Sequence, residues 1–180
     1  MSYLVGSLMF SFYLGKIKGI NIRNIGDGNP GAANVFKACG WPLEILAALL
    51  DFGKGFLPVY IIYQVYGIRD FRAIPIALAV VLGHAFSIFM QFGGGKAIAV
   101  TFGIWAGLTL WQMPIVLGLG LLFLKFVLGI KNDGYNIVFG MLVSSGYFAF
   151  KFDWILVIIF TLNFLIIVYK HRSVLKSSLR

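Results

Sequence analysis

The chain has 180 residues, of which 60% are hydrophobic and only 12% are charged. A soluble domain carries about 25% charged residues, so this composition excludes an ordinary soluble protein and predicts an integral membrane protein. The net charge of +9 is interpreted as cytoplasmic loops that face anionic lipid and anionic substrates, not as a nucleic-acid surface. At this length we expect a single domain, residues 1–180.

Apolar segments in chain order predict an all-α bundle of about seven transmembrane helices. The expected helices cover 3–14, 42–66, 73–90, 97–111, 114–130, 134–150 and 154–169. A straight span needs about 20 residues, and several of these segments are shorter. The expected number of spans is therefore five to seven, with some helices tilted, buried or half-crossing.

The distribution of Lys and Arg predicts the orientation. With the amino terminus outside, the inner loops and the carboxyl terminus hold eleven of these residues, whereas the outer loops hold only Arg69, Arg72 and Lys151. Cytoplasmic loops are enriched in Lys and Arg. The carboxyl terminus and the two glycine-rich segments described next are therefore expected to face the cytoplasm, where they could meet in one site.

The first glycine-rich segment, residues 22–37 (IRNIGDGNPGAANVFK), follows the first expected helix. Lipid offers no hydrogen bonds, so irregular backbone at membrane depth must be buried in protein or line a site. Gly and Asn adopt left-handed conformations at low cost, which predicts a tight loop. Its amides could bind a phosphate or a hydroxyl; the alternative is a re-entrant turn without a ligand. The candidate ligands are Arg23, Gly28, Asn29, Gly31 and Asn34.

The second segment, residues 83–101, places His84 near the end of one helix and Gly93, Gly94, Gly95 and Lys96 before the next. A glycine run followed by lysine at a helix start can bind an anion, because the N–H groups and the helix dipole point the same way. It lacks the GxxxxGK[ST] spacing of a nucleotide-binding P-loop. His84 is either a satisfied buried histidine or a functional group, and ionisable groups at membrane depth favour function.

Two further groups of charged residues each have a structural and a functional interpretation. Asp51 and Lys54 lie three residues apart within one span, so they form either a structural ion pair or a site in which Lys54 binds an anion. At the carboxyl end, Lys170, Lys176 and Arg180 are interpreted as a positive stop that contacts lipid headgroups. His171 and Arg172 are instead candidate site residues, because they would enter from the same face as the two glycine-rich segments.

Metal and covalent catalysis have no support in the sequence. The two histidines are 87 positions apart and the six acidic residues are scattered, so no cluster has metal-ligand spacing. A Ser/His/Asp arrangement is also absent. We therefore expect neither a metal nor a cofactor.

Four segments together resemble a known family. In order and spacing, NIRNIGDGNPGAANVFKACG, LLDFGKGFLPV, LGHAFSIFMQFGGGKAIAVTFG and VYKHRSVL are similar to the bacterial acyl-phosphate-dependent glycerol-3-phosphate acyltransferases, the PlsY family. The resemblance covers most of residues 16–175. It implies a seven-helix enzyme of the bacterial inner membrane with a cytoplasmic active site. It also implies two substrates, acyl phosphate and glycerol 3-phosphate, which give lysophosphatidic acid and inorganic phosphate.

The resemblance also implies residue roles. Lys96 and the amides of Gly93–Gly95 would hold one phosphate, while Asn29, Asn34, Lys37 and Arg172 would hold the other and orient the glycerol. His84 and His171 would position groups or transfer a proton, a role typically worth about 10²–10⁴-fold in rate. The substrate phosphate could itself be the base.

The chain departs from the family pattern at several of these positions. Asp27 and Ala33 replace the serine and threonine of GSGNxGATN, and Lys37 replaces an arginine. Gly93 and Ala97 replace a lysine and a glycine of FKGGKG, and Val174 replaces an asparagine. An anion at Asp27 is unfavourable beside a phosphate unless Arg23 or Lys37 pairs with it. The alternative function is therefore a divergent, catalytically impaired relative that binds or transports a phosphorylated metabolite or lipid. The oligomeric state is open.

Overall fold

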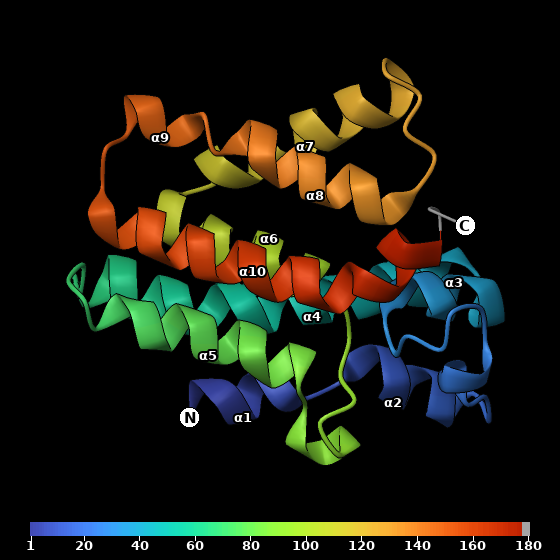
Figure 1. Ribbon diagram of the computed structural model, residues 1–180. Helices are drawn as coiled ribbons and strands as arrows, with labels where there is room; N and C mark the ends of the chain where they lie inside the picture. Colours follow the sequence, from blue (N-terminus) through green and yellow to red (C-terminus); the bar gives the residue numbers. More distant parts are fainter. Residues whose placement is uncertain (178–180) are drawn as a thin grey trace.

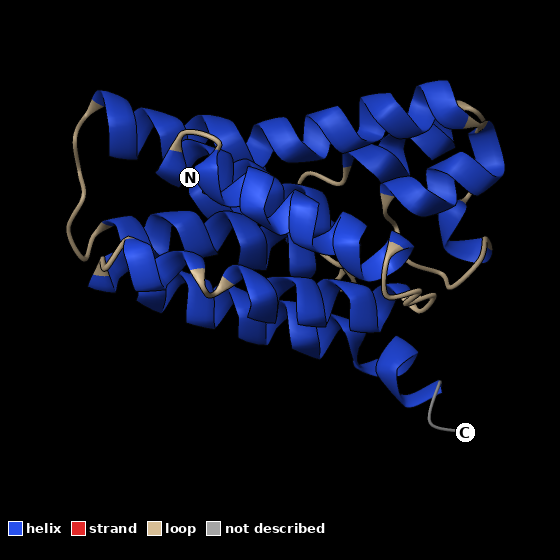
Figure 2. Ribbon diagram, turned by 90° about the horizontal axis from the view of Figure 1, so that it is seen from above, coloured by secondary structure: helices blue, strands red, loops and turns tan. Residues whose placement is uncertain are grey.

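The structure is a computed structural model that describes residues 1–177, and every regular element in that part of the chain is a helix. The predicted all-α class is therefore confirmed (Figure 2). The elements in chain order are α1 (Ser2–Ser7), α2 (Phe10–Ile17), η1 (Ile22–Asn24), α3 (Ala32–Cys39), α4 (Trp41–Tyr60), η2 (Ile61–Val65), α5 (Ala73–Ala85), η3 (Ile88–Met90), α6 (Ile98–Thr109), α7 (Gln112–Phe126), α8 (Asp133–Ser144), α9 (Tyr147–Phe150) and α10 (Trp154–Ser177).

The long helices α4, α5 and α10 form the middle of the molecule (Figure 1). Helix α6 packs against α4, and α10 packs against α5, α8 and α6. A buried polar chain ties α6 to α10: Trp105 Nε1 donates to Asn163 Oδ1 at 3.1 Å, and Asn163 Nδ2 donates to Thr101 Oγ1 at 3.1 Å. In lipid such hydrogen bonds help hold helices together. They fix α6, which follows Lys96, against α10, which carries His171.

Within residues 1–177, three helical segments are long and apolar enough to cross a membrane: Trp41–Val65, Ala73–Met90 and Trp154–Lys176. Shorter apolar helices, Ile98–Thr109 and Gln112–Phe126, pack among them. The fold is that of a multi-pass membrane protein. Trp41, Trp111 and Trp154 are 65%, 52% and 66% exposed at or beside helix ends, as an interfacial aromatic belt requires. The count of seven spans, the outside amino terminus and the single domain over residues 1–180 stay predictions.

The expected first helix, 3–14, is wrong as a continuous element. Leu8 is extended, with φ −67° and ψ 115°, so the chain leaves α1 and restarts at α2. The broken helix is tolerated because side chains satisfy its carbonyls. Ser87 Oγ donates to the carbonyl of Ser7 at 2.5 Å, and Lys54 Nζ donates to the carbonyl of Leu8.

Two other expected helices are also interrupted. The segment 73–90 leaves the α-helix after Ala85, which frees the chain to form the second glycine-rich loop. The segment 134–150 divides into α8 and α9 at Ser145 and Gly146. There the hydroxyls of Ser144 and Ser145 donate to carbonyls of their own helix, at 2.7 and 2.6 Å. Such local hydrogen bonds compete with a continuing helix.

Candidate functional site

Three segments that are distant in sequence enclose a pocket of about 380 Å³. They are the loop around η1, the loop between η3 and α6, and the end of α10. The lining residues are Arg23, Asp27, Gly28, Asn29, Pro30, Gly93, Gly94, Lys96, Lys170, Arg172 and Ser173. The two glycine-rich segments and the carboxyl end of α10 therefore meet, as the sequence predicted.

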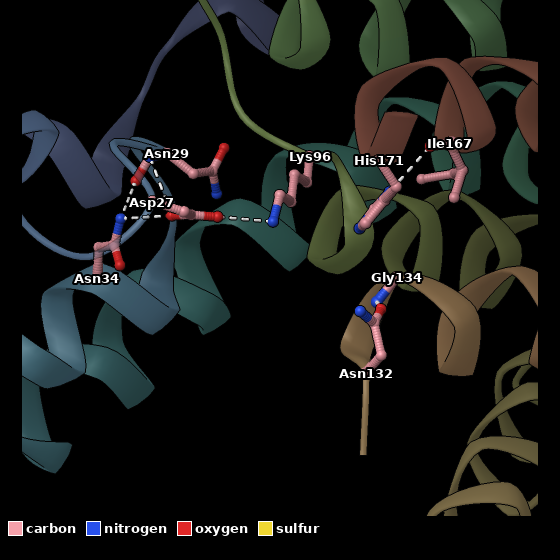
Figure 3. Close-up of polar contacts among 8 residues, drawn as sticks. All are labelled: Asp27, Asn29, Asn34, Lys96, Asn132, Gly134, Ile167 and His171. Atoms are coloured by element: carbon pink, nitrogen blue, oxygen red, sulfur yellow. Dashed lines mark hydrogen bonds and ion pairs between the residues drawn. The ribbon is translucent and has the colours of Figure 1, made fainter. Parts of the chain in front are cut away.

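The first loop is folded around the carboxylate of Asp27. Its Oδ1 accepts a hydrogen bond from the backbone N–H of Asn29 at 3.1 Å and another from Asn34 Nδ2 at 2.9 Å (Figure 3). Asn34 also donates to the carbonyl of Asn29 at 2.9 Å and is only 2% exposed. Gly28 has φ +72°, the left-handed conformation that its position in the turn requires. Asn34 thus holds the loop from beneath and does not line the pocket.

Asp27 also forms an ion pair with Lys96. Asp27 Oδ2 and Lys96 Nζ are 2.7 Å apart, with the side chains 42% and 20% exposed. Burial alone would raise the pKa of Asp27, but the hydrogen bonds from Lys96, from the backbone of Asn29 and from Asn34 hold that pKa at about 2. Neither Arg23 nor Lys37, the two cations considered as possible partners, pairs with Asp27 in the described residues. The carboxylate instead neutralises the lysine that the sequence assigned to phosphate.

The second loop is fixed by two cations that donate to its carbonyls. Arg23 Nη2 donates to Gly93 O at 2.6 Å and to Met90 O at 3.3 Å. Lys170 Nζ donates to Gly94 O at 3.1 Å and to Ala85 O at 2.8 Å. The interpretation of Lys170 as a lipid contact is therefore wrong. Its position directly before the candidate site residues His171 and Arg172 was the sequence signal that could have indicated its role in the site. Lys176 is exposed, and Arg180 lies outside the described residues.

The expected cradle of three glycine amides is only partly present. The N–H of Gly93 donates to Met90 O and that of Gly95 to His84 O, each at 3.0 Å. Among the described residues, no acceptor is assigned to the N–H of Gly94. Gly94 therefore offers the amide of this run that can face an anion.

His84 lies beneath the second loop, outside the pocket lining. A Cβ on Gly95 would collide with its imidazole, which explains the glycine at that position. His84 is 4% exposed, and its Nδ1 lies 3.8 Å from Asp51 Oδ1. Within residues 1–177 no hydrogen-bond partner is found for this nitrogen.

Lys54 is part of the same buried cluster and does not reach the pocket. Its Nζ lies 2.7 Å from Asp51 Oδ1, and Asp51 Oδ2 accepts a hydrogen bond from Ser11 at 2.9 Å. Of the two alternatives for Lys54, the structure has the ion pair with Asp51, and the same ammonium donates to the carbonyl of Leu8. Anion binding by Lys54 stays a prediction that these contacts do not favour.

The remaining predicted residues surround the pocket. The guanidinium of Arg172 lines it and lies 4.0 Å from the centre of the Tyr169 ring. His171 is 1% exposed, and its Nδ1 bonds to the carbonyl of Ile167 at 2.8 Å, which requires the proton on Nδ1. Gly31 caps α3, and Lys37 is exposed on α3 with its ammonium near Gly26, outside the lining.

Comparison with known proteins identifies relatives along the whole chain. Residues 1–180 match the family model described as glycerol-3-phosphate acyltransferase. Glycerol-3-phosphate acyltransferase 1 of Thermotoga maritima is 36% identical over 193 residues, an alignment that covers 100% of this chain and 95% of that protein. The glycerol-3-phosphate acyltransferase of Endomicrobium trichonymphae is 32% identical, with 98% and 87% covered.

Solved structures agree with the sequence comparison. The crystal structure of PlsY (YgiH), an integral membrane glycerol 3-phosphate acyltransferase, in its glycerol 3-phosphate form superposes with a TM-score of 0.91 at 28% identity. The superposition covers 99% of this chain and 88% of that one.

Proposed function

The chain belongs to the glycerol-3-phosphate acyltransferase family, and from this premise we propose that it transfers a fatty acyl group from acyl phosphate to the sn-1 hydroxyl of glycerol 3-phosphate. It is a membrane enzyme, and glycerol 3-phosphate is its acceptor. The identity of the acyl donor is the part of this proposal that depends on the pocket. One observation carries it: four cations, Arg23, Lys96, Lys170 and Arg172, converge on the lining with the single carboxylate of Asp27.

That charge suits two phosphate groups. Glycerol 3-phosphate brings one, and an acyl phosphate brings a second directly at the reacting carbonyl. A thioester donor would have no anion at that point. Of the four cations, Arg23 and Lys170 donate to carbonyls that hold the second loop, and Arg172 donates through Nη1 to the carbonyl of Tyr169 in its own helix at 2.8 Å. Lys96 pairs with Asp27, and Arg172 is exposed with its other nitrogen atoms left to bind substrate. We assign the donor phosphate to Lys96 and the Gly94 amide, and the acceptor phosphate to Arg172, with Asn29 beside the glycerol.

The reaction requires one substitution at the acyl carbon. The sn-1 oxygen of glycerol 3-phosphate forms the new ester bond, the bond between the acyl carbon and the phosphate oxygen breaks, and inorganic phosphate leaves. Lys96 stabilises the negative charge that develops on the leaving phosphate. The hydroxyl proton passes to a phosphate oxygen of the substrates, because His84 and His171 are buried outside the lining. These histidines support the second loop and α10 instead.

The orientation of the site follows from the same charges. We propose that the pocket faces the cytoplasm of a bacterial cell, across the inner membrane. The eleven Lys and Arg residues of the expected inner segments support this, as do the positions of Arg69, Arg72 and Lys151 in the loops at the other ends of the same helices.

The donor can be tested by phosphate release. The protein reconstituted in lipid is expected to release inorganic phosphate from palmitoyl phosphate only when glycerol 3-phosphate is present, and to form lysophosphatidic acid in equal amount. Palmitoyl-coenzyme A serves as the matched thioester donor and is expected to give no product. Transfer from the thioester but not from palmitoyl phosphate would contradict the proposed donor. Binding of glycerol 3-phosphate without turnover of either donor would favour the impaired relative.

The carboxylate of Asp27 is expected to weaken substrate binding. Asp27→Asn keeps the oxygen that accepts from Asn29 and Asn34. It removes the negative charge that pairs with the Lys96 ammonium. A partly exposed ion pair is worth roughly 0.2–1 kcal/mol, so KM for palmitoyl phosphate should fall by up to about fivefold with kcat unchanged. Steady-state phosphate release measures both. Asp70→Asn, in the loop before α5, is the control.

The pH dependence of this effect is fixed by the depressed pKa of Asp27, about 2 against 3.8. A lowered pKa in the folded protein means that the ion pair is complete above about pH 4 and is lost only as the pH falls through about 2. The ratio of KM between Asp27→Asn and the wild type should therefore be constant from pH 5 to 9. A ratio that changes within that range would contradict the assignment.

A further inference from the structure

A second pocket, of about 420 Å³, lies at the opposite end of the bundle from the acyltransferase site. Its lining residues come from the end of α4 and η2, from the turn between α6 and α7, and from the segment between α9 and α10. The lining residues are Tyr63, Gln64, Arg69, Leu108, Thr109, Leu110, Gln112, Tyr147, Phe150, Lys151, Phe152, Asp153 and Leu156. The proposed reaction uses none of them.

The side chain of Arg69 is held in this pocket by contacts with Gln64 and Tyr63. Its Nη2 donates to Gln64 Oε1 at 2.9 Å, and its guanidinium lies 5.4 Å from the centre of the Tyr63 ring. Gln64 is fixed in turn, because its Nε2 donates to the carbonyls of Gly107 and Leu108, both at 3.0 Å. An arginine with a fixed fork is suited to a phosphate group.

The other charges of the pocket leave it positive. Lys151 is exposed, and in the described part of the chain its ammonium makes no hydrogen bond or ion pair. Asp153 brings one negative charge to the lining, and its Oδ1 accepts from the N–H groups of Ile155 and Leu156 at 2.9 and 3.2 Å and so caps α10. The pocket therefore offers two cations against one carboxylate, and beside them Tyr147 donates its hydroxyl proton to Gln112 Oε1 at 2.8 Å, which leaves the amide nitrogen of Gln112 as a further donor.

The backbone around the pocket is unusual in two places. Residues Ile61–Val65, which include Tyr63 and Gln64, form a π-helix. Leu110 and Trp111 have φ of 47° and 74°, a conformation that bulky residues rarely adopt. π-Helical turns and strained residues gather at functional sites. Both irregularities place side chains at this one pocket.

The rim of the pocket is apolar and exposed. Phe150, Phe152 and Leu110 are 92%, 70% and 55% exposed, and Trp154 follows at 66%. Tryptophan at the end of a span typically lies at the headgroup level of a membrane, and Trp154 begins α10 beside Phe150 and Phe152. Exposed cations beside exposed apolar side chains suit an amphiphile whose phosphate contacts Arg69 and Lys151 and whose chains stay in lipid.

We propose that this pocket binds the phosphate of a phospholipid headgroup from the leaflet opposite to the acyltransferase site, with Arg69 and Lys151 as the anion ligands. The aromatic rim contacts the glycerol backbone and the first methylene groups. The site is separate from the reaction proposed above, and its occupant is a structural or regulatory lipid. The shared chemistry, a phosphate ester, could also be supplied by a soluble compound, and the test distinguishes the two.

Thermal unfolding of delipidated protein in dodecyl maltoside tests the proposal without using acyl transfer. Dioleoyl phosphatidylglycerol is expected to raise the unfolding midpoint saturably, by about 5 °C at 100 times Kd. Dioleoylglycerol, which has the same chains and no phosphate, should leave it unchanged. Glycerophosphoglycerol, which has the headgroup and no chains, identifies the source: an equal shift would assign the site to soluble phosphate esters.

Three variants locate the effect. Arg69→Gln and Lys151→Gln should each abolish most of the shift; Lys151 makes no assigned contact, so its replacement should leave the fold intact. Arg72→Gln is the matched control, because Arg72 lies in the same loop as Arg69 but pairs with Asp70 at 2.7 Å outside the pocket. A shift that survives in both Arg69→Gln and Lys151→Gln, or that dioleoylglycerol reproduces, would overturn the proposal.

Discussion

Lys96→Ala is expected to lower phosphate release from palmitoyl phosphate by about 10²–10³-fold, the cost of removing one donor that stabilises developing negative charge. Lys96 Nζ is the cation of the pocket that pairs with a side chain and not with backbone, so a substrate phosphate can take over that position. Arg23 and Lys170 hold the second loop through its carbonyls and cannot replace it without releasing the loop.

The measurement is steady-state phosphate release with saturating glycerol 3-phosphate, beside a thermal unfolding curve that shows the variant is folded. Lys18→Ala is the control, because Lys18 is exposed on the same side of the protein and does not line the pocket. Activity within threefold of the wild type in a folded Lys96→Ala protein would exclude Lys96 from the site.

Among the proposed substitutions, Lys54→Met is expected to cause the largest decrease in the free energy of unfolding. It leaves the carboxylate of Asp51, which is 2% exposed, without its cation, and it removes the donor to the Leu8 carbonyl. Breaking a buried ion pair by removing one partner typically costs about 3–5 kcal/mol. For a chain of this size that corresponds to a fall in the unfolding midpoint on the order of 10 °C.

The double variant Asp51→Asn/Lys54→Met separates charge from packing. Because it removes the stranded carboxylate, it should be more stable than Lys54→Met alone. Lys125→Met is the control, since Lys125 is half-exposed and 3.8 Å from Asp133. If the double variant is no better than the single one, the loss comes from packing or from the Leu8 carbonyl and not from the buried charge.

Local patterns predicted the class of the fold and the meeting of the two glycine-rich segments, but long-range partners decided the details. The hydrophobic pattern of residues 3–14 is continuous, and the break at Leu8 depends on two distant side chains. Lys54 donates to Leu8 across 46 positions, and Ser87 donates to Ser7 across 80. Similarly, the motif order located Lys96, Asn29 and Arg172 near one another. It could not show that Asp27 would pair with Lys96 across 69 positions.

The roles of the glycine run and of Lys170 illustrate the same limit. The letters GGGK suggested three free amides, whereas the turn consumes two of them in its own hydrogen bonds. A lysine after an apolar helix usually contacts headgroups. Lys170 instead points back to Ala85 and Gly94, and only the packing of α10 against α5 determines that direction.

The anchorage of the second loop by Lys170 has a consequence for the order in which the protein matures. Both glycine-rich segments leave the ribosome before α10 does, yet the carbonyls of Ala85 and Gly94 receive their cation only when α10 has entered the bilayer. A nascent chain that ends before residue 170 would contain Lys96 and the glycine amides of the second loop. It would lack the end of α10, which is the third segment that lines the pocket. We therefore expect acyl transfer to require the inserted last helix, so that a chain ending before Lys170 would be inactive.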